Sequence, residues 1–234
     1  LKRAKVLVLN YPNNPAGRGA SEEFFRSVVD FAQKNNIVII HDAAYAALVY
    51  GRKPLSFLSI PGAKEVGLEI HSLSKAFNMT GWRMAFVAGR KELVAAYGTV
   101  KDNTDSGQFI AVQKAAAVAL AHPEITERTR LKYERRLVAM VETLKKLGFD
   151  ARMPDGSFFL FVRAPKGTAD GKSFANAEEF SQFLIREKLI STVPFDDVGN
   201  YVRFSATFVA KDEADEKRVL DEFARRLDGM KLVF

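Results

Sequence analysis

The feature that most constrains the fold is a series of four short apolar runs in the first 90 residues. They span residues 4–10 (AKVLVLN), 36–42 (NIVIIHD), 66–74 (VGLEIHSLS) and 84–89 (MAFVAG), and helical stretches separate them. Strands that face water on one side alternate apolar and polar residues, whereas strands buried on both faces give continuous apolar runs. The pattern therefore predicts an α/β fold with a mainly parallel sheet that helices cover on both faces.

The segment after the first run has the pattern of an amphipathic helix. Ser21 is a favourable N-cap residue, and two acidic residues follow it in the first turn, where the helix dipole stabilises negative charge. The predicted buried face of this helix consists of Phe24, Val28, Val29 and Ala32.

The second half of the chain has a different pattern. It turns helical at Phe109, with a break at Pro123 and a stop at Gly148. A strand, a helix, a strand and a helix then follow at residues 155–164, 176–189, 200–208 and 211–227. We predict two domains: residues 1–120 form part of a larger domain, and residues 121–234 form an interdomain helix and a smaller α+β domain.

Composition narrows the classes of function. The 234 residues carry a net charge of +7, but the basic residues are scattered and interleaved with acidic ones, which argues against a nucleic-acid surface. No apolar run approaches the roughly 20 residues that a membrane span needs. The absence of cysteine excludes disulfides, thiolate catalysis and cysteine-ligated metals, and it fits a cytoplasmic protein. We expect no metal, no nucleic acid and no membrane partner.

Chemically useful side chains follow the predicted strands, at the strand ends where ligands gather in folds of this kind. They are Asn14 after the first strand, Asp42 and Tyr45 after the second, and Ser72, Ser74, Lys75 and Arg83 after the third. A phosphorylated aromatic aldehyde would use all of these groups. The amine would form a Schiff base, the carboxylate would keep a pyridine nitrogen protonated, and the hydroxyls and guanidinium would hold the phosphate.

These residues stand in four motifs: NNPAG (13–17), HDAAY (41–45), SLSKAFNMTGWR (72–83) and YVRFS (201–205). In their order and spacing the chain resembles the fold-type I pyridoxal-phosphate enzymes, specifically the class I/II aminotransferases. Within that family the sequences of these motifs are most similar to those of the LL-diaminopimelate aminotransferase-like branch. The resemblance covers essentially the whole chain.

The resemblance implies a function and a set of site residues. Lys75 would form the Schiff base with pyridoxal 5'-phosphate and move the proton during amino-group transfer between an amino acid and a 2-oxo acid. Asp42 would pair with the pyridinium nitrogen, and Arg203 would bind the substrate α-carboxylate. The implied cofactor-binding residues are Asn14, Asp42, Tyr45, Ser72, Ser74, Lys75 and Arg83; the implied substrate-binding residues are Asn14 and Arg203.

Simpler interpretations of single residues stand beside this one. A lysine after a strand is usually solvated, and Asp42 alone could merely cap a helix. Arg83 could form a surface ion pair, and Arg203 could be an ordinary strand arginine. We expect His71 to pack inside the protein rather than to act as a catalyst.

Relatives in the family usually run to about 400 residues, so the resemblance also implies that this chain is the C-terminal portion of a longer enzyme. Such a portion should be poorly active alone and should expose apolar surface and a sheet edge. The branch implies LL-diaminopimelate and 2-oxoglutarate as substrates, a role in lysine biosynthesis, and a homodimer at full length. Two alternatives stay open: a pyridoxal-phosphate lyase on the same fold, and an aminotransferase-like regulatory domain.

Overall fold

The computed structural model describes residues 3–234, which form two compact units. The first unit consists of the residues up to Asn13, together with Arg18–Leu131 and Asp155–Ser157. The second unit consists of Asn14–Gly17, Lys132–Pro154 and Phe158–Phe234. Helix α6 (Glu124–Lys146) contributes to both.

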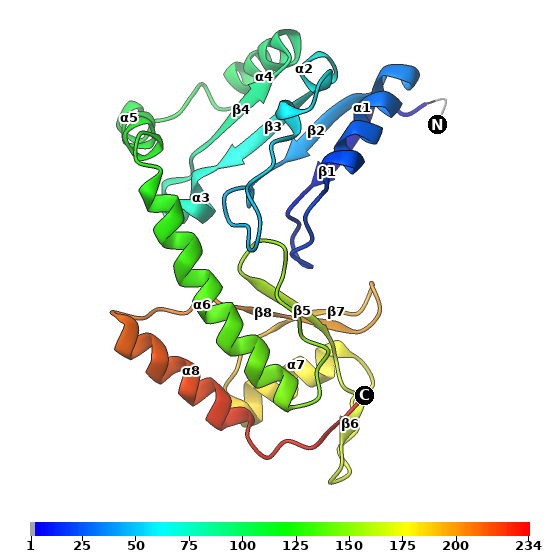
Figure 1. Ribbon diagram of the computed structural model, residues 1–234, viewed down its shortest axis with the longest axis vertical. Helices are drawn as coiled ribbons and strands as arrows, with labels where there is room; N and C mark the ends of the chain where they lie inside the picture. The colour runs from blue at the N-terminus through cyan, green and yellow to red at the C-terminus, as the bar shows by residue number, and fades with distance from the viewer. Residues whose placement is uncertain (1–2) are drawn as a thin grey trace. The chain divides into compact units, whose positions relative to one another are not determined.

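The first unit is built on a four-stranded sheet in the order β1-β2-β3-β4 (Figure 1). Its strands are β1 (Val6–Asn10), β2 (Val38–Asp42), β3 (Gly67–Ser72) and β4 (Ala85–Gly89). The first three strands are parallel, as the continuous apolar runs predict, and they carry Asn10, Asp42 and Ser72 at their carboxyl ends.

Strand β4 departs from the parallel pattern, because it runs antiparallel to β3. The two strands are joined only by the short helices α3 (Leu73–Ala76) and η2 (Thr80–Trp82). The N–H of Leu73 donates to the carbonyl of Met84 at 3.1 Å, so the connection ends beside its starting point. A parallel return needs a crossover to the opposite end of the sheet. The apolar run alone does not distinguish the two directions.

Helix α1 (Glu22–Asn35) begins as predicted, with the Ser21 Oγ accepting the N–H of Phe24 at 3.2 Å. The predicted buried face was wrong at one position. Phe25 is 1% exposed and Phe24 is 37% exposed. The helical stripe runs through positions 25, 28, 29 and 32, which have the i, i+3, i+4, i+7 spacing, and Phe24 lies beside it.

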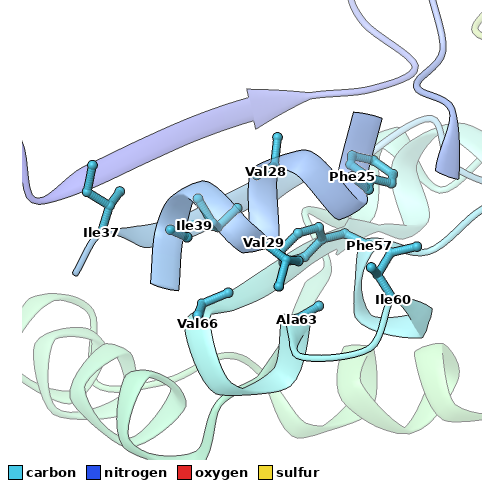
Figure 2. Packing of buried hydrophobic residues seen from close by; sticks show 10 residues of the cluster. Phe25, Val28, Val29, Ile37, Ile39, Phe57, Ile60, Ala63 and Val66 are labelled. Carbon is cyan, nitrogen blue, oxygen red and sulfur yellow. The ribbon is translucent and has the colours of Figure 1, made fainter. Parts of the chain in front are cut away.

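A cluster of buried side chains joins α1 to one face of the sheet and to the segment between β2 and β3 (Figure 2). That segment contains η1 (Phe57–Ser59) and α2 (Ala63–Val66). The cluster consists of Phe25, Val28, Val29, Ala32, Ile37, Ile39, Phe57, Ile60, Ala63 and Val66. Burial of each large side chain contributes on the order of 2 kcal/mol, so this cluster holds α1 against β2 and against the segment that leads into β3.

Other apolar surface in the first unit is exposed. Val8 on β1 is 64% exposed. The prediction that helices cover both faces of the sheet was therefore wrong for this strand. Helices α4 (Lys91–Thr104) and α5 (Ile110–Leu120) also present large apolar side chains to solvent, including Val100, Ile110 and Val118. No helix in residues 3–234 combines the length and apolar character that a membrane span requires.

The second unit contains an antiparallel sheet in the order β5-β8-β7. Its elements are β5 (Phe159–Arg163), β6 (Gly167–Thr168), α7 (Ala177–Lys188), β7 (Val193–Phe195), β8 (Tyr201–Ser205), α8 (Glu213–Leu227) and β9 (Leu232–Val233). The four predicted elements in this region are present, as is the break between α5 and α6 near Pro123. The short strands β6, β7 and β9 were not foreseen.

Candidate functional site

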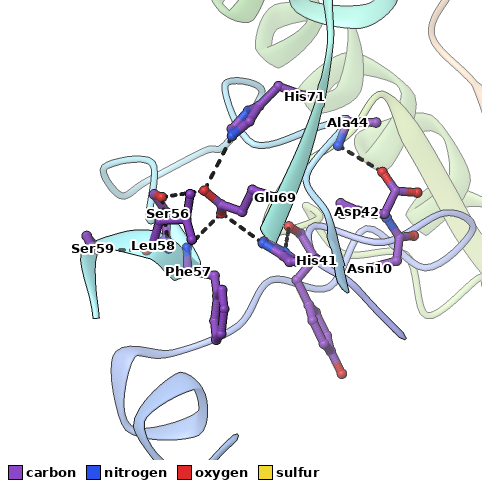
Figure 3. Close-up of polar contacts among 11 residues, drawn as sticks. Asn10, His41, Asp42, Ala44, Ser56, Phe57, Leu58, Ser59, Glu69 and His71 are labelled. Atoms are coloured by element: carbon purple, nitrogen blue, oxygen red, sulfur yellow. Dashed lines mark hydrogen bonds and ion pairs between the residues drawn. The ribbon is translucent and has the colours of Figure 1, made fainter. Parts of the chain in front are cut away.

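The end of β2 presents Asp42 in a fixed orientation. Its Oδ1 accepts the backbone N–H of Ala44 at 3.1 Å, and its carbonyl accepts the side-chain amide of Asn10 at 3.0 Å (Figure 3). Asp42 lies opposite Asn10 on β1 and opposite Ile70 on β3. The side chain is half-buried, so its carboxylate is held by the backbone of the turn and still reaches the surface of the unit.

Tyr45 and Lys75 come together from different strand ends. The Lys75 Nζ lies 5.8 Å from the centroid of the Tyr45 ring, within the range of a cation–π contact. Tyr45 is 5% exposed, and Lys75 is half-buried on α3. The structure therefore places an amine against a buried phenol beside the carboxyl ends of β2 and β3.

The two serines before Lys75 have local roles in α3. The Ser72 Oγ accepts the N–H of Ser74 at 3.2 Å and caps the helix. Ser74 is 7% exposed, and its carbonyl accepts the hydroxyl of Thr80 at 2.9 Å. These contacts fix the backbone conformation before and after Lys75.

Arg83 follows η2 in an unusual backbone conformation. Its φ is 53°, in the left-handed region that residues other than glycine rarely adopt. The guanidinium donates to the Thr80 carbonyl at 2.9 Å, and the Arg83 carbonyl accepts the amide of Gln108 at 3.1 Å. Ala85, two residues later, pairs with Ser72, so Arg83 lies at the sheet edge where β3 ends.

Asn14 and Arg203 belong to the second unit. The Arg203 Nη1 donates to the Asn14 Oδ1 at 2.6 Å. The guanidinium carbon lies 4.1 Å from the centroid of the Phe159 ring and 5.8 Å from that of Phe195. The Arg203 guanidinium therefore lies against two aromatic rings and beside the Asn14 amide.

The motifs did not predict a buried polar cluster in the first unit, on the face of the sheet opposite the Asp42 side chain. Glu69 is 1% exposed and accepts the Ser56 hydroxyl at 2.5 Å and the Phe57 N–H at 2.7 Å (Figure 3). Its oxygens also lie 2.9 Å from His41 Nδ1 and 3.4 Å from His71 Nε2. Burial raises the pKa of Glu69, but the four hydrogen bonds outweigh it and hold the pKa well below its usual range.

A sequence signal for this cluster existed. Glu69 interrupts a continuous apolar strand, and a carboxylate in such a position must be paired. His41 is 0% exposed in the neighbouring strand and lies opposite Glu69 in the register. His71 is packed as expected: it contacts Glu69 and stacks on Phe86 with ring centroids 5.0 Å apart.

The fold is that of an α/β protein with a carboxylate, a phenol and an amine at neighbouring strand ends, and comparison with known proteins gives its family. A family model described as aminotransferase class I and II matches residues 1–221. The chain belongs to this family.

Curated relatives narrow the similarity. The chain is 60% identical to the LL-diaminopimelate aminotransferases of Methanococcus maripaludis and Methanocaldococcus jannaschii, and each match covers 100% of this chain and 57% of the relative. The corresponding enzyme of Aquifex aeolicus is 41% identical over 99% of this chain. The chain thus spans a little over half the length of the curated relatives that it matches.

Solved structures have the same fold. Substrate-bound BacF from Bacillus subtilis superposes with a TM-score of 0.87 at 34% identity, covering 100% of this chain and 57% of that one. An aminotransferase from Staphylococcus aureus gives a TM-score of 0.85 at 32% identity, over 97% of this chain and 58% of that one. These matches confirm the predicted α/β class and the resemblance to the aminotransferase family.

Proposed function

We propose that the protein containing this chain is a pyridoxal-phosphate-dependent aminotransferase that transfers an amino group from LL-diaminopimelate to 2-oxoglutarate. The observation that carries the proposal is the pairing of Lys75 with buried Tyr45 at the strand ends, in a chain 60% identical to two LL-diaminopimelate aminotransferases. The proposal includes a role in lysine biosynthesis, a cytoplasmic location and a homodimer at full length.

The residues of the first unit fit the cofactor in their chemistry. When bound, pyridoxal phosphate supplies an aldehyde that exchanges amino groups and a pyridine ring that accepts electrons. Lys75 would be the amine that attaches to the aldehyde, and it would also be the base that carries the proton. The backbone of the turn already orients the Asp42 carboxylate. A fixed carboxylate is what a protonated ring nitrogen needs as its partner.

The remaining residues would bind and orient. The Tyr45 hydroxyl and the Asn14 amide would donate to the ring oxygen, and the Ser72 and Ser74 hydroxyls and the Arg83 guanidinium would hold the phosphate. Arg203 would bind the substrate carboxylate, because a guanidinium can bind a carboxylate through two parallel hydrogen bonds and this one lies against the rings of Phe159 and Phe195. We propose that residues 1–120 supply part of the cofactor-binding domain and residues 121–234 supply the smaller domain.

Labelling tests the proposal directly. We expect borohydride treatment of the full-length protein with pyridoxal phosphate to fix the cofactor on the peptide that contains Lys75. The Lys75→Arg variant keeps the positive charge and should lose both the label and transamination, with a loss of several orders of magnitude in kcat. A label on any other lysine would refute the proposed mechanism.

The substrate assignment has its own test. With LL-diaminopimelate and 2-oxoglutarate, the full-length protein should form glutamate, detected with a coupled dehydrogenase. Release of ammonia or loss of a carbon fragment instead would identify a lyase on the same fold. The 234-residue chain alone should transaminate poorly, and rapid turnover by it would contradict the interpretation of this chain as part of a longer enzyme.

A further inference from the structure

Both ring nitrogens of His41 face hydrogen-bond acceptors. Nδ1 lies 2.9 Å from the Glu69 Oε1 (Figure 3). Nε2 lies 3.0 Å from the carbonyl oxygen of Tyr11. His41 is 0% exposed, and the rings of Phe25 and Phe57 pack against it with centroids 5.1 Å and 6.2 Å away. Water therefore does not reach the imidazole.

The geometry determines how many protons the pair holds. A neutral imidazole has one N–H, and its other nitrogen only accepts. A carbonyl oxygen cannot donate, so Nε2 must carry a proton to bond Tyr11. The bond to Glu69 then requires one further proton, either on Nδ1 or on the carboxylate.

The surroundings of Glu69 place that proton on the histidine. The carboxylate already accepts the Ser56 hydroxyl and the Phe57 N–H, at 2.5 Å and 2.7 Å, and His71 approaches at 3.4 Å. Donors of this kind stabilise the ionised form of a carboxylate and oppose its protonation. His41, Glu69 and His71 are the titratable groups of the cluster in the part of the chain that the structure describes.

We infer that His41 is a doubly protonated imidazolium, buried in an ion pair with Glu69, and that it is a positioning residue for the reaction. The pair connects the residue after β1, the end of β2, β3 and the start of η1. Asp42 is the next residue along β2 and faces the other side of the sheet, because successive side chains of a strand alternate. The positioning role rests on the proposed function; the protonation state does not.

Nitrogen NMR of the full-length protein with ¹⁵N-labelled histidine tests the protonation state. The His41 signals can be assigned by their loss in His41→Gln, and exposed His122 is the surface reference. In the wild-type protein we expect a proton on both nitrogens of His41, because both face acceptors. In Glu69→Gln one of the two nitrogens should lose its proton. A neutral His41 in the wild-type protein would overturn the inference.

Kinetics of the cofactor-loaded protein test the positioning role. In Glu69→Gln we expect kcat to fall of order ten- to a hundredfold with little change in KM, because a small displacement of Asp42 affects the reacting ring more than substrate binding. The visible absorbance of the bound cofactor should shift as well. The control is His71→Gln, whose side chain is 28% exposed and makes the longest contact to Glu69, and it should stay near the wild-type kcat.

Ser56→Ala is the milder variant, in case Glu69→Gln does not fold. It removes one donor to the carboxylate and should lower kcat in the same direction by a smaller factor. Wild-type kcat and absorbance in the folded, loaded variants would overturn the positioning role. If the wild-type protein binds no cofactor at Lys75, the proposed function fails, whereas the NMR result on His41 still stands or falls independently.

Discussion

Within residues 3–234 each unit buries one carboxylate, and the two are paired with different basic side chains. In the first unit Glu69 pairs with His41, at 1% and 0% side-chain exposure. In the second unit Glu216 accepts from Arg136 Nε and Arg135 Nε, both at 2.6 Å, and Arg136 is 4% exposed. Burial raises the pKa of Glu216, but the two arginines lower it by more than burial raises it. The pKa of Glu216 is therefore shifted downward, as is the pKa of Glu69.

The difference lies in what the cation can do when its partner is removed. Arg136 cannot lose its proton, and it also donates to the carbonyls of Ala206 and Phe208 at 3.0 Å and 2.7 Å. A histidine can become neutral when the anion is absent. The ion pair between α6 and α8 in the second unit therefore keeps its charged arginines. The strength of the pair in the first unit depends instead on whether the histidine is protonated.

The largest effect is expected at the arginine pair. Glu216→Gln leaves Arg136 charged in a buried place, so it should lower the free energy of unfolding by about 3 kcal/mol or more. Urea unfolding followed by circular dichroism measures this change. Glu127→Gln is the matched control, because Glu127 pairs with Arg130 on the surface at 57% exposure, where solvent screens the pair, and its loss should change stability far less. Equal effects of the two variants would contradict the burial argument.

A smaller effect is expected at the histidine pair. Glu69→Gln should lower the free energy of unfolding by about 1–2 kcal/mol at neutral pH, because a histidine can become neutral and the amide oxygen can still accept the Phe57 N–H while the amide NH2 donates to the Ser56 hydroxyl. The same urea experiment gives the value. If Glu69→Gln destabilises as much as Glu216→Gln, protonation does not distinguish the two pairs.

The smallest effect is in the pH dependence. The pKa of Glu69 is lower in the folded protein than its ordinary value of about 4.3. As the pH falls toward and below that value, the unfolded chain binds more protons than the folded protein does, so the free energy of unfolding decreases. Glu69→Gln removes this contribution, and the gap between wild type and variant should narrow as the pH falls from about 5 to about 3. Urea midpoints across that range measure the gap. A constant gap would mean that Glu69 is not ionised in the folded protein.

Much of the architecture follows from local pattern. The continuous apolar runs predicted β1, β2 and β3, and Ser21 with its acidic neighbours predicted the start of α1. The motifs predicted that Asp42 and Lys75 stand at strand ends, and the structure has Asp42 as the last residue of β2 and Lys75 on the short helix after β3. These features depend on residues that are near one another in the sequence, so a single chain is enough to find them.

Other features needed the tertiary structure. The direction of β4 depends on the hydrogen bond between Leu73 and Met84, and the burial of Phe25 in place of Phe24 depends on which stripe of α1 meets the sheet. His41 and Glu69 are 28 residues apart and meet only through the register of β2 and β3.

The sequence by itself therefore determined the class of fold, the family resemblance and the residues proposed to hold a cofactor, because motifs and periodicity are local. Only the tertiary structure decided which buried charges are paired and with what. Pairing depends on strand register and on exclusion of water, and both arise from contacts between segments far apart in the chain.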